Sequence, residues 1–138
     1  ICPQRRNLHL QPGAGAAGGV GFAVNAFLNG RIISGWRFFA GITNLEEKIA
    51  SADLVISGEG RIDTQPLSGK VIDGVLALAD KYDKPVWLFC GVNSLQEVPA
   101  KIKIFQLADL EPDIEKCKKN ATALLERLAC IHFSKILQ

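Results

Sequence analysis

Residues 52–91 read ADLVISGEGRIDTQPLSGKVIDGVLALADKYDKPVWLFCG and join two apolar runs through a charged, glycine-rich segment and an amphipathic one. The apolar runs at 52–58 and 84–91 are short and continuous, which is typical of strands buried on both faces of a sheet. Between them, residues 70–82 repeat apolar side chains at helical spacing. A buried strand, a crossover helix and a second buried strand predict a right-handed parallel unit.

The flanking sequence extends this unit into an α/β fold, a parallel-sheet, Rossmann-like sandwich. Residues 1–11 are expected to be irregular and residues 12–138 to form one α/β domain. The further elements that we predict are a helix at 20–28, a strand and turn at 31–42, a capping box at Thr43–Glu46 opening a helix to about Ala50, a strand at 102–107, and one long helix from Pro112 to about Ile136.

Composition excludes several classes of protein. The chain has 138 residues, of which 48% are hydrophobic and 22% charged, as in ordinary globular domains. The net charge is only +2, from 16 basic and 14 acidic residues, so there is no electrostatic case for a nucleic acid or an anionic membrane as a partner. No apolar run reaches the length of a membrane span, and residues 1–11 lack the apolar core of a signal peptide.

The four cysteines, Cys2, Cys90, Cys117 and Cys130, form no C-x-x-C pair and show no metal-ligand spacing. A disulfide framework is not expected in a chain of this size. Buried or idle thiols in a reducing compartment fit the pattern, and we therefore predict a cytoplasmic location.

The segment SGEGRIDTQPLSGK, residues 57–70, lies directly after the first buried strand, where ligands bind in doubly wound sheets. Its glycines, Gly58 and Gly60, let the backbone come close to a ligand. Arg61 and Lys70 can hold the oxygens of a phosphate or carboxylate. Glu59 and Asp63 can position a hydroxyl group, take its proton or bind Mg²⁺. The alternative is a surface loop in which Arg61 pairs with one of these carboxylates.

Two short motifs fail their own requirements. The SGK at 68–70 is not a phosphate-binding P-loop, because Thr64 and Val71 stand where that motif needs Gly and Ser or Thr. The GAGAAG at 13–18 fits G-x-G-x-x-G, but no convincing strand precedes it and no acidic residue follows about 20 positions later. Small-residue packing and an anion-binding turn remain as its two interpretations, and a nicotinamide-dependent oxidoreductase is disfavoured.

Taken together, PGAGAAGGVGFAVNAFL at 12–28, ADLVISGEGRIDTQPLSGKVIDGVLALA at 52–79 and KPVWLFCG at 84–91 resemble the bacterial type of glycerate kinase. The similarity continues more loosely into the terminal helix. The resemblance implies that ATP and Mg²⁺ are used to phosphorylate a hydroxyl of D-glycerate, in the cleft of a two-domain enzyme.

By position, the resemblance implies roles for individual residues. Gly13, Gly15, Gly18 and Gly19 would form a close-approach turn, and Glu59, Gly60, Arg61, Asp63 and Lys70 would line the cleft. Phosphoryl transfer needs cations on phosphate oxygens and a carboxylate on the attacking hydroxyl. We expect Asp63 to hold the hydroxyl or the metal, and Arg61 and Lys70 to hold phosphate or the substrate carboxylate.

The chain also departs from the family pattern. Members look more than twice as long, the similar segment is their C-terminal portion, and residues 1–11 do not resemble what usually precedes the glycine turn. We therefore expect the 138 residues alone to be inactive and poorly soluble, because sheet strands would be missing at an exposed edge. The rival interpretation is a module that binds a nucleotide or an organic acid without chemistry.

Overall fold

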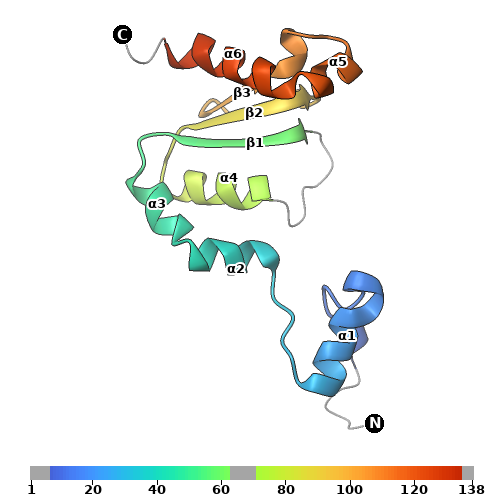
Figure 1. Cartoon of the computed structure of the whole chain (residues 1–138). Coiled ribbons are helices and arrows are strands. Elements are labelled where there is room, and N and C mark those ends of the chain that lie inside the picture. The colour runs from blue at the N-terminus through green and yellow to red at the C-terminus, as the bar shows by residue number, and fades with distance from the viewer. Residues whose placement is uncertain (1–6, 63–70, 135–138) are drawn as a thin grey trace. The chain divides into compact units, whose positions relative to one another are not determined.

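The computed structural model describes residues 7–62 and 71–134. The chain divides into two compact units, Ile1–Asn44 and Leu45–Gln138. This division falls inside residues 12–138, which the sequence assigned to one domain. The first unit is helical, and the second contains the sheet (Figure 1).

The first unit contains a short 3₁₀ helix, η2 (Leu8–Leu10), followed by α1 (Ala16–Leu28) and α2 (Gly35–Ile42). The first turn of α1 is distorted, because residues 17–19 have positive φ angles of 51°, 68° and 97°. Regular helix therefore runs from about residue 20, as predicted for residues 20–28. Asn29, in the left-handed conformation, caps its end.

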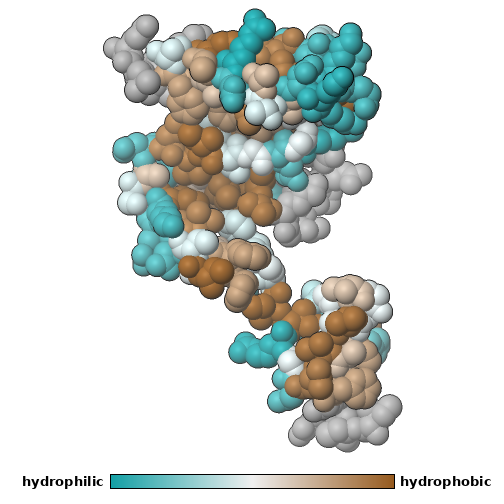
Figure 2. All heavy atoms as spheres, in the orientation of Figure 1, coloured by the Kyte–Doolittle hydropathy of each residue, from teal (hydrophilic) through white to brown (hydrophobic). Residues whose placement is uncertain are grey.

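The prediction of a strand and turn at 31–42 was wrong, because Gly35–Ile42 forms α2. Trp36 and Ala40, four residues apart, are both half-buried, as expected for one face of a helix. Phe38 and Phe39 remain 48% and 63% exposed, and Figure 2 shows hydrophobic surface over this helix. The aromatic and branched residues favour strand locally, but their helical spacing decided the structure.

The second unit has alternating helices and strands: α3 (Leu45–Ser51), β1 (Val55–Ile62), α4 (Val71–Lys81), β2 (Val86–Asn93), β3 (Ile102–Gln106), η3 (Leu107–Asp109), α5 (Ile114–Lys119) and α6 (Ala121–Phe133). The three strands form one parallel sheet in the order β1-β2-β3. The α/β class, the parallel sheet and the crossover helix between the first two strands are confirmed.

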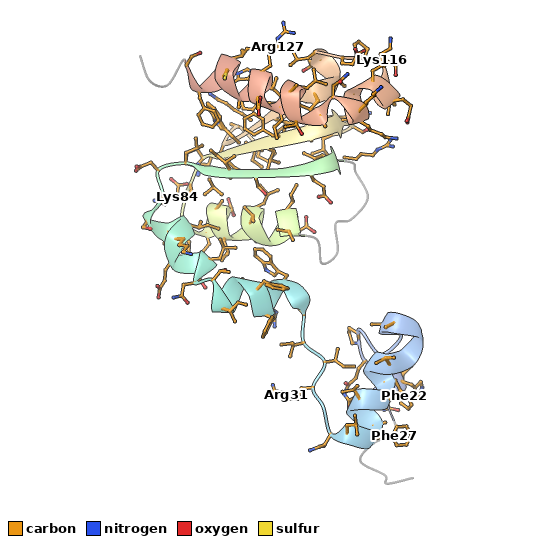
Figure 3. The ribbon with its side chains drawn as sticks, viewed as in Figure 1. Phe22, Phe27, Arg31, Lys84, Lys116 and Arg127 are labelled. Carbon is orange, nitrogen blue, oxygen red and sulfur yellow. The ribbon has the colours of Figure 1, made fainter. Side chains whose placement is uncertain are left out.

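Helices cover both faces of this sheet (Figure 1). On one face, α4 packs its buried residues Ile72, Val75 and Ala79 against the sheet. On the other, α5, α6 and η3 cover a core made of Trp87, Phe89, Leu107, Cys117 and Leu128. Figure 3 shows Lys116 and Arg127 on the outer side of α5 and α6, away from the strands. Helices on both faces explain why β2, buried from Val86 to Cys90, reads as a continuous apolar run.

The predicted capping box at Thr43–Glu46 does not form. The Thr43 hydroxyl donates to the carbonyl of Phe39, at 2.7 Å, and so completes the end of α2. The Glu46 carboxylate accepts instead from Lys81 Nζ, at 2.6 Å, and from the Tyr82 hydroxyl, at 2.8 Å. Glu46 therefore contacts Lys81 and Tyr82, which are distant in sequence. These contacts replace the local one that the motif predicts.

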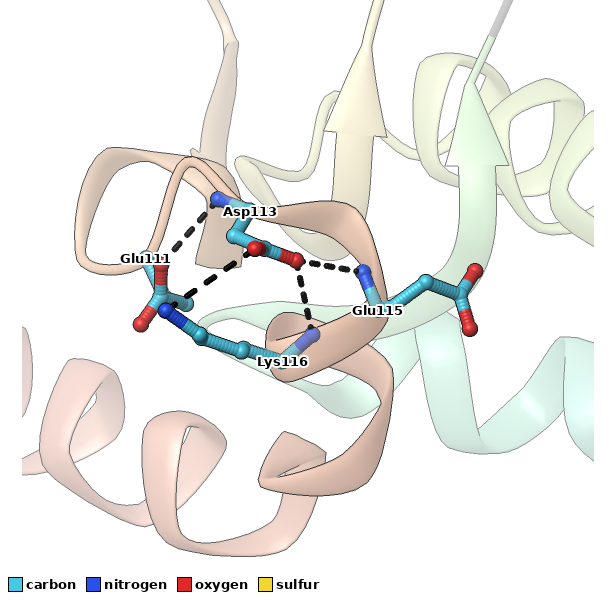
Figure 4. Close-up of polar contacts among 4 residues, drawn as sticks. All are labelled: Glu111, Asp113, Glu115 and Lys116. Atoms are coloured by element: carbon cyan, nitrogen blue, oxygen red, sulfur yellow. Dashed lines mark hydrogen bonds and ion pairs between the residues drawn. The ribbon is translucent and has the colours of Figure 1, made fainter.

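The predicted single helix from Pro112 to Ile136 is two helices, with a break at Asn120 (φ −107°, ψ 17°). The first, α5, begins after Pro112 because Asp113 is its N-cap. The Asp113 carboxylate accepts from the backbone N–H groups of Glu115 and Lys116 at 3.0 and 3.1 Å (Figure 4). The bend allows Cys117 of α5 and Leu128 of α6 to enter the same core.

Candidate functional site

The charged segment that was predicted to leave the first strand at once remains part of that strand. β1 continues to Ile62, with Glu59 opposite Cys90 and Arg61 opposite Val92 of β2. Glu59, Gly60 and Arg61 are therefore strand residues, not loop residues, because pairing with β2 holds their backbone extended. The carboxyl end of β1 thus presents charged side chains from a regular element.

The two charged residues of this strand end differ in their exposure. Glu59 is half-buried and Arg61 is exposed. Within the described residues, no ion pair links Arg61 to Glu59, so that part of the surface-loop alternative is not seen. Asp63 and Lys70, the other two residues predicted for this site, lie outside the described residues.

Glycine is required in this region because β1 and β2 approach closely. A Cβ atom on Gly58 would lie 2.6 Å from the carbonyl oxygen of Phe89, and one on Gly91 would lie 2.5 Å from that of Gly60. Neither glycine has a positive φ angle. Gly60 itself has open space around its own Cβ position. The glycines at 58 and 91 therefore serve the packing of two strands.

The glycine turn at residues 13–19 belongs to the first unit and has a different geometry. Gly13, Gly18 and Gly19 have φ angles of 89°, 68° and 97°, which favour glycine, whereas Gly15 has φ −78°. A cavity of about 470 Å³ lies beside this turn, lined by Gln11, Pro12, Gly13, Ile32, Ile33 and Ser34. The structure thus gives Gly13, Gly18 and Gly19, but not Gly15, the conformation of a tight turn.

The segment before this turn does not match a dinucleotide-binding site. In such a site a strand leads into the glycine motif. Among the described residues before Gly13, the only regular element is the 3₁₀ helix η2. A nicotinamide-dependent oxidoreductase is therefore still the disfavoured interpretation.

An apolar groove of about 700 Å³ lies on the α5 and α6 face of the sheet, beside β1. The side chains of Ile56, Phe89, Leu125 and Phe133 and the backbone of Gly58 line it. Ile56 and Leu125 are 51% and 44% exposed. The helices of this face thus cover β2 well and β1 poorly.

The sequence analysis missed three polar residues at the carboxyl edge of the same sheet: Asn93, Gln106 and Asp109. Gln106 Oε1 accepts from the backbone N–H of Asn93, at 3.1 Å, and Gln106 Nε2 donates to Asp109 Oδ1, at 2.8 Å. The available signal was position, because Asn93 and Gln106 are the last residues of the two apolar strands.

Cys90 is a buried residue of β2, the middle strand, and it lines the groove. Burial, together with the negative charge of Asp109, raises the pKa of Cys90 to about 11. A thiol protonated at neutral pH is a poor nucleophile and a poor metal ligand. Cys117 is also buried, whereas Cys130 is exposed, and all three are free. These three cysteines fit the predicted idle thiols.

The described residues show neither a metal cluster nor a helix suited to a membrane. No group of three or more His, Cys, Asp or Glu side chains is arranged to hold a metal ion within residues 7–62 and 71–134. Over the same residues, no helix combines the length and the apolar character that crossing a membrane needs.

A model of the glycerate kinase family matches residues 3–136. This chain belongs to that family. The resemblance found in the sequence is confirmed, and the match includes most of residues 1–11, which the sequence analysis had set apart.

Individual relatives agree with this assignment. The chain is 55% identical over 86 residues to glycerate 2-kinase of Escherichia coli, covering 59% of this chain and 23% of that one. It is 36% identical over 121 residues to glycerate kinase of Neisseria meningitidis, covering 85% and 32%. A solved structure described as a candidate glycerate kinase 2 of Salmonella typhimurium superposes with a TM-score of 0.52 at 35% identity, covering 89% and 33%.

This glycerate kinase family chain matches only part of each of these proteins. It spans about a third or less of the length of each, from 23% to 33%. The fold of the matched portion is thus shared, and the activity of the whole protein is a separate question.

Proposed function

We propose that this chain supplies part of the active site of an ATP-dependent kinase that phosphorylates a hydroxyl group of D-glycerate in the cytoplasm. One structural observation carries the proposal beyond family membership. The parallel strand β1 delivers Glu59 and Arg61 to the carboxyl end of the sheet on regular, hydrogen-bonded backbone. Ligands of open parallel sheets bind at that end.

Each residue has a role in this proposal. The exposed Arg61 guanidinium holds two oxygens of a phosphate or of the substrate carboxylate, a geometry that a lysine does not reproduce. Lys70 adds a second cation, and Asp63 holds the glycerate hydroxyl or takes its proton. Gly60 keeps the floor of the site open, because no atom lies near its Cβ position. The turn with Gly13, Gly15, Gly18 and Gly19 offers backbone N–H groups to phosphate oxygens.

The donor set of this strand end fits Mg²⁺ in the form that phosphoryl transfer uses. Mg²⁺ is commonly bound by one or two carboxylates together with substrate phosphates and waters. Glu59 and Asp63 would supply the carboxylates, so a closed cluster of three protein ligands is not needed. The ion would neutralise negative charge on the transferring phosphoryl group.

The apolar groove supports the proposal that the chain is inactive alone. β1 is an edge strand, and its Ile56 is half exposed on the poorly covered face. The relatives have two thirds or more of their length outside the matched portion. We propose that this remaining polypeptide covers the groove and completes the cleft. α4 packs against the opposite face of β1, so it does not cover the groove.

The first test is a coupled ADP-release assay with D-glycerate, ATP and Mg²⁺. It compares this chain with a hybrid in which the aligned segment of the E. coli glycerate 2-kinase is replaced by this chain. We expect turnover only in the hybrid. A folded hybrid that binds ATP without turnover would favour the non-catalytic binding module. A folded hybrid that neither binds ATP nor turns over would contradict the proposal.

Substitutions in an active hybrid test the roles. Arg61→Lys should lower kcat/KM by about 100-fold, because one bidentate charged contact contributes about 2–3 kcal/mol. Asp63→Asn should lower kcat by a similar or larger factor. Arg127→Ala is the matched control, since Arg127 lies on the outer side of α6 (Figure 3). Unchanged turnover in Asp63→Asn would remove its assigned role.

The groove has its own test. In the hybrid, Ile56→Asp should destabilise the fold strongly, because a carboxylate would be buried beneath the covering element. In the chain alone the same change should matter little, since Ile56 is 51% exposed. Ile114→Asp, at a position 55% exposed on α5, is the control. Equal effects of Ile56→Asp in the two proteins would show that nothing covers the groove.

A further inference from the structure

The carboxyl end of β2 extends beyond its pairing with β3. The last pair between these strands joins Cys90 to Gln106, whereas β2 continues to Asn93. Beyond Cys90, the register continues only with β1, where Arg61 lies opposite Val92 and Ile62 opposite Asn93. The backbone N–H of Asn93 therefore has no backbone partner from β3, and a parallel strand end in this position would fray.

The side chain of Gln106 replaces that missing partner. Its Oε1 accepts the Asn93 N–H at 3.1 Å, and its Nε2 donates to Asp109 Oδ1 at 2.8 Å. Only one orientation of the amide satisfies both contacts, because a backbone N–H needs an oxygen and a carboxylate needs a donor. Gln106 is half-buried, which further restricts its side chain. The amide thus joins β2 to η3 in a defined geometry.

Gln106 fixes the end of β2, and the residue after β2 is hydrogen-bonded to the end of β1. The N–H of Ser94, directly after β2, donates to the carbonyl of Ile62 at 2.8 Å. Ile62 is only 2% exposed and is the last residue of β1. Arg61 precedes it, and Asp63 follows it in the sequence. A displacement of residues 93–94 would therefore shift Ile62 and, with it, the neighbouring Arg61.

We propose that Gln106 is a positioning residue for this site. It fixes the end of β2 through Asn93, and thereby the end of β1 that carries Arg61. It does not itself contact substrate in this role. The inference rests on the proposed kinase function for its catalytic part, whereas its structural part can be tested without activity.

The structural part is tested by amide hydrogen exchange on this chain, resolved by residue, in the wild type and in three variants. Gln106→Leu removes both hydrogen bonds at similar volume. Gln106→Glu combined with Asp109→Asn keeps an acceptor for Asn93, and the amide introduced at position 109 can donate to the new carboxylate. Asp109→Asn is the control, because its side-chain oxygen still accepts from Gln106. We expect about tenfold faster exchange at Asn93 in Gln106→Leu, with Trp87 in the middle of β2 unchanged. Equal acceleration at Asn93 and Trp87 would indicate general destabilisation and overturn the inference, as would no change at Asn93.

The catalytic part is tested in the active hybrid. Gln106→Leu should lower kcat by about tenfold, a moderate loss for a small misplacement of reacting groups. The double change Gln106→Glu with Asp109→Asn should lose less than Gln106→Leu, and Asp109→Asn alone should have little effect. Combined with Arg61→Lys, the loss from Gln106→Leu should be less than additive, since both act through the same contact. Full additivity, or an unchanged kcat, would overturn the positioning role.

The two proposals fail in different ways. If the hybrid with Gln106 intact has no turnover, the kinase proposal fails, and the catalytic role of Gln106 fails with it. The exchange experiment then still decides whether Gln106 fixes the strand end. If the hybrid is active and the Gln106 variants turn over as fast as the Asp109→Asn control, the kinase proposal stands. The positioning role of Gln106 is then wrong.

Discussion

Glycines at the turn of the first unit and glycines between β1 and β2 meet two different physical demands. Gly18 and Gly19 have positive φ angles, and no atom lies near their Cβ positions. Gly58 and Gly91 have ordinary φ angles, but a Cβ on either would meet a backbone carbonyl oxygen at 2.6 or 2.5 Å. The first pair is required by local conformation, and the second by the approach of a neighbouring strand.

The largest loss of stability is expected where a new Cβ atom would meet the neighbouring strand. Gly58→Ala and Gly91→Ala should each lower the free energy of unfolding by about 2–3 kcal/mol, because the clash is with backbone that cannot rotate away. Urea unfolding, followed by Trp87 fluorescence in a Trp36→Phe background, measures this change. Gly60→Ala, with open space and no positive φ angle, is the matched control. A neutral Gly91→Ala would show that the strands can separate without loss.

A smaller effect is expected at the turn. Gly18→Ala and Gly19→Ala should each cost about 1–2 kcal/mol, the penalty of a left-handed conformation for a residue with a Cβ atom. Gly15→Ala is the control, because φ is −78° there. Hydrogen exchange over residues 20–28 reports the stability of α1. Similar exchange in Gly15→Ala and Gly18→Ala would contradict the assigned conformations.

Replacing an alanine by glycine in the same turn should increase stability slightly. Ala17 has φ 51°, so Ala17→Gly removes backbone strain while adding entropy to the unfolded chain. We expect a net gain of about 0.5 kcal/mol in the stability of this turn. Slower exchange over residues 20–28 would confirm it, and faster exchange would place the strain elsewhere.

The burial of Cys90 in β2 also has a chemical consequence. Burial, and to a smaller extent the charge of Asp109, raises the pKa of Cys90 to about 11. At pH 8, iodoacetamide should modify the exposed Cys130 much faster than Cys90, as mass spectrometry of peptides can show. Because the folded state holds this proton more tightly than the unfolded state, stability should fall as pH rises from about 9 towards 11. In the Gly91→Ala variant, faster labelling of Cys90 would link both effects to the same packing.

The sequence alone determined the class of the fold and the family. The apolar runs at 52–58 and 84–91, separated by a helical repeat, are typical of parallel strands joined by a crossover helix. The helical repeat predicted at 70–82 forms α4 (Val71–Lys81), which buries one apolar face. These signals are local and repeated along many residues, so no single contact could overturn them.

Tertiary contacts decided what local patterns left open. Thr43 and Glu46 have the sequence of a capping box, but Lys81 and Tyr82, distant in sequence, bind Glu46 instead. Pairing with β2 kept Glu59 and Arg61 in a strand although their glycine-rich sequence resembles a loop. Gln106 became a candidate only when folding brought it to Asn93. In each case the deciding partner lies elsewhere in the sequence, and its contribution exists only after the chain has folded.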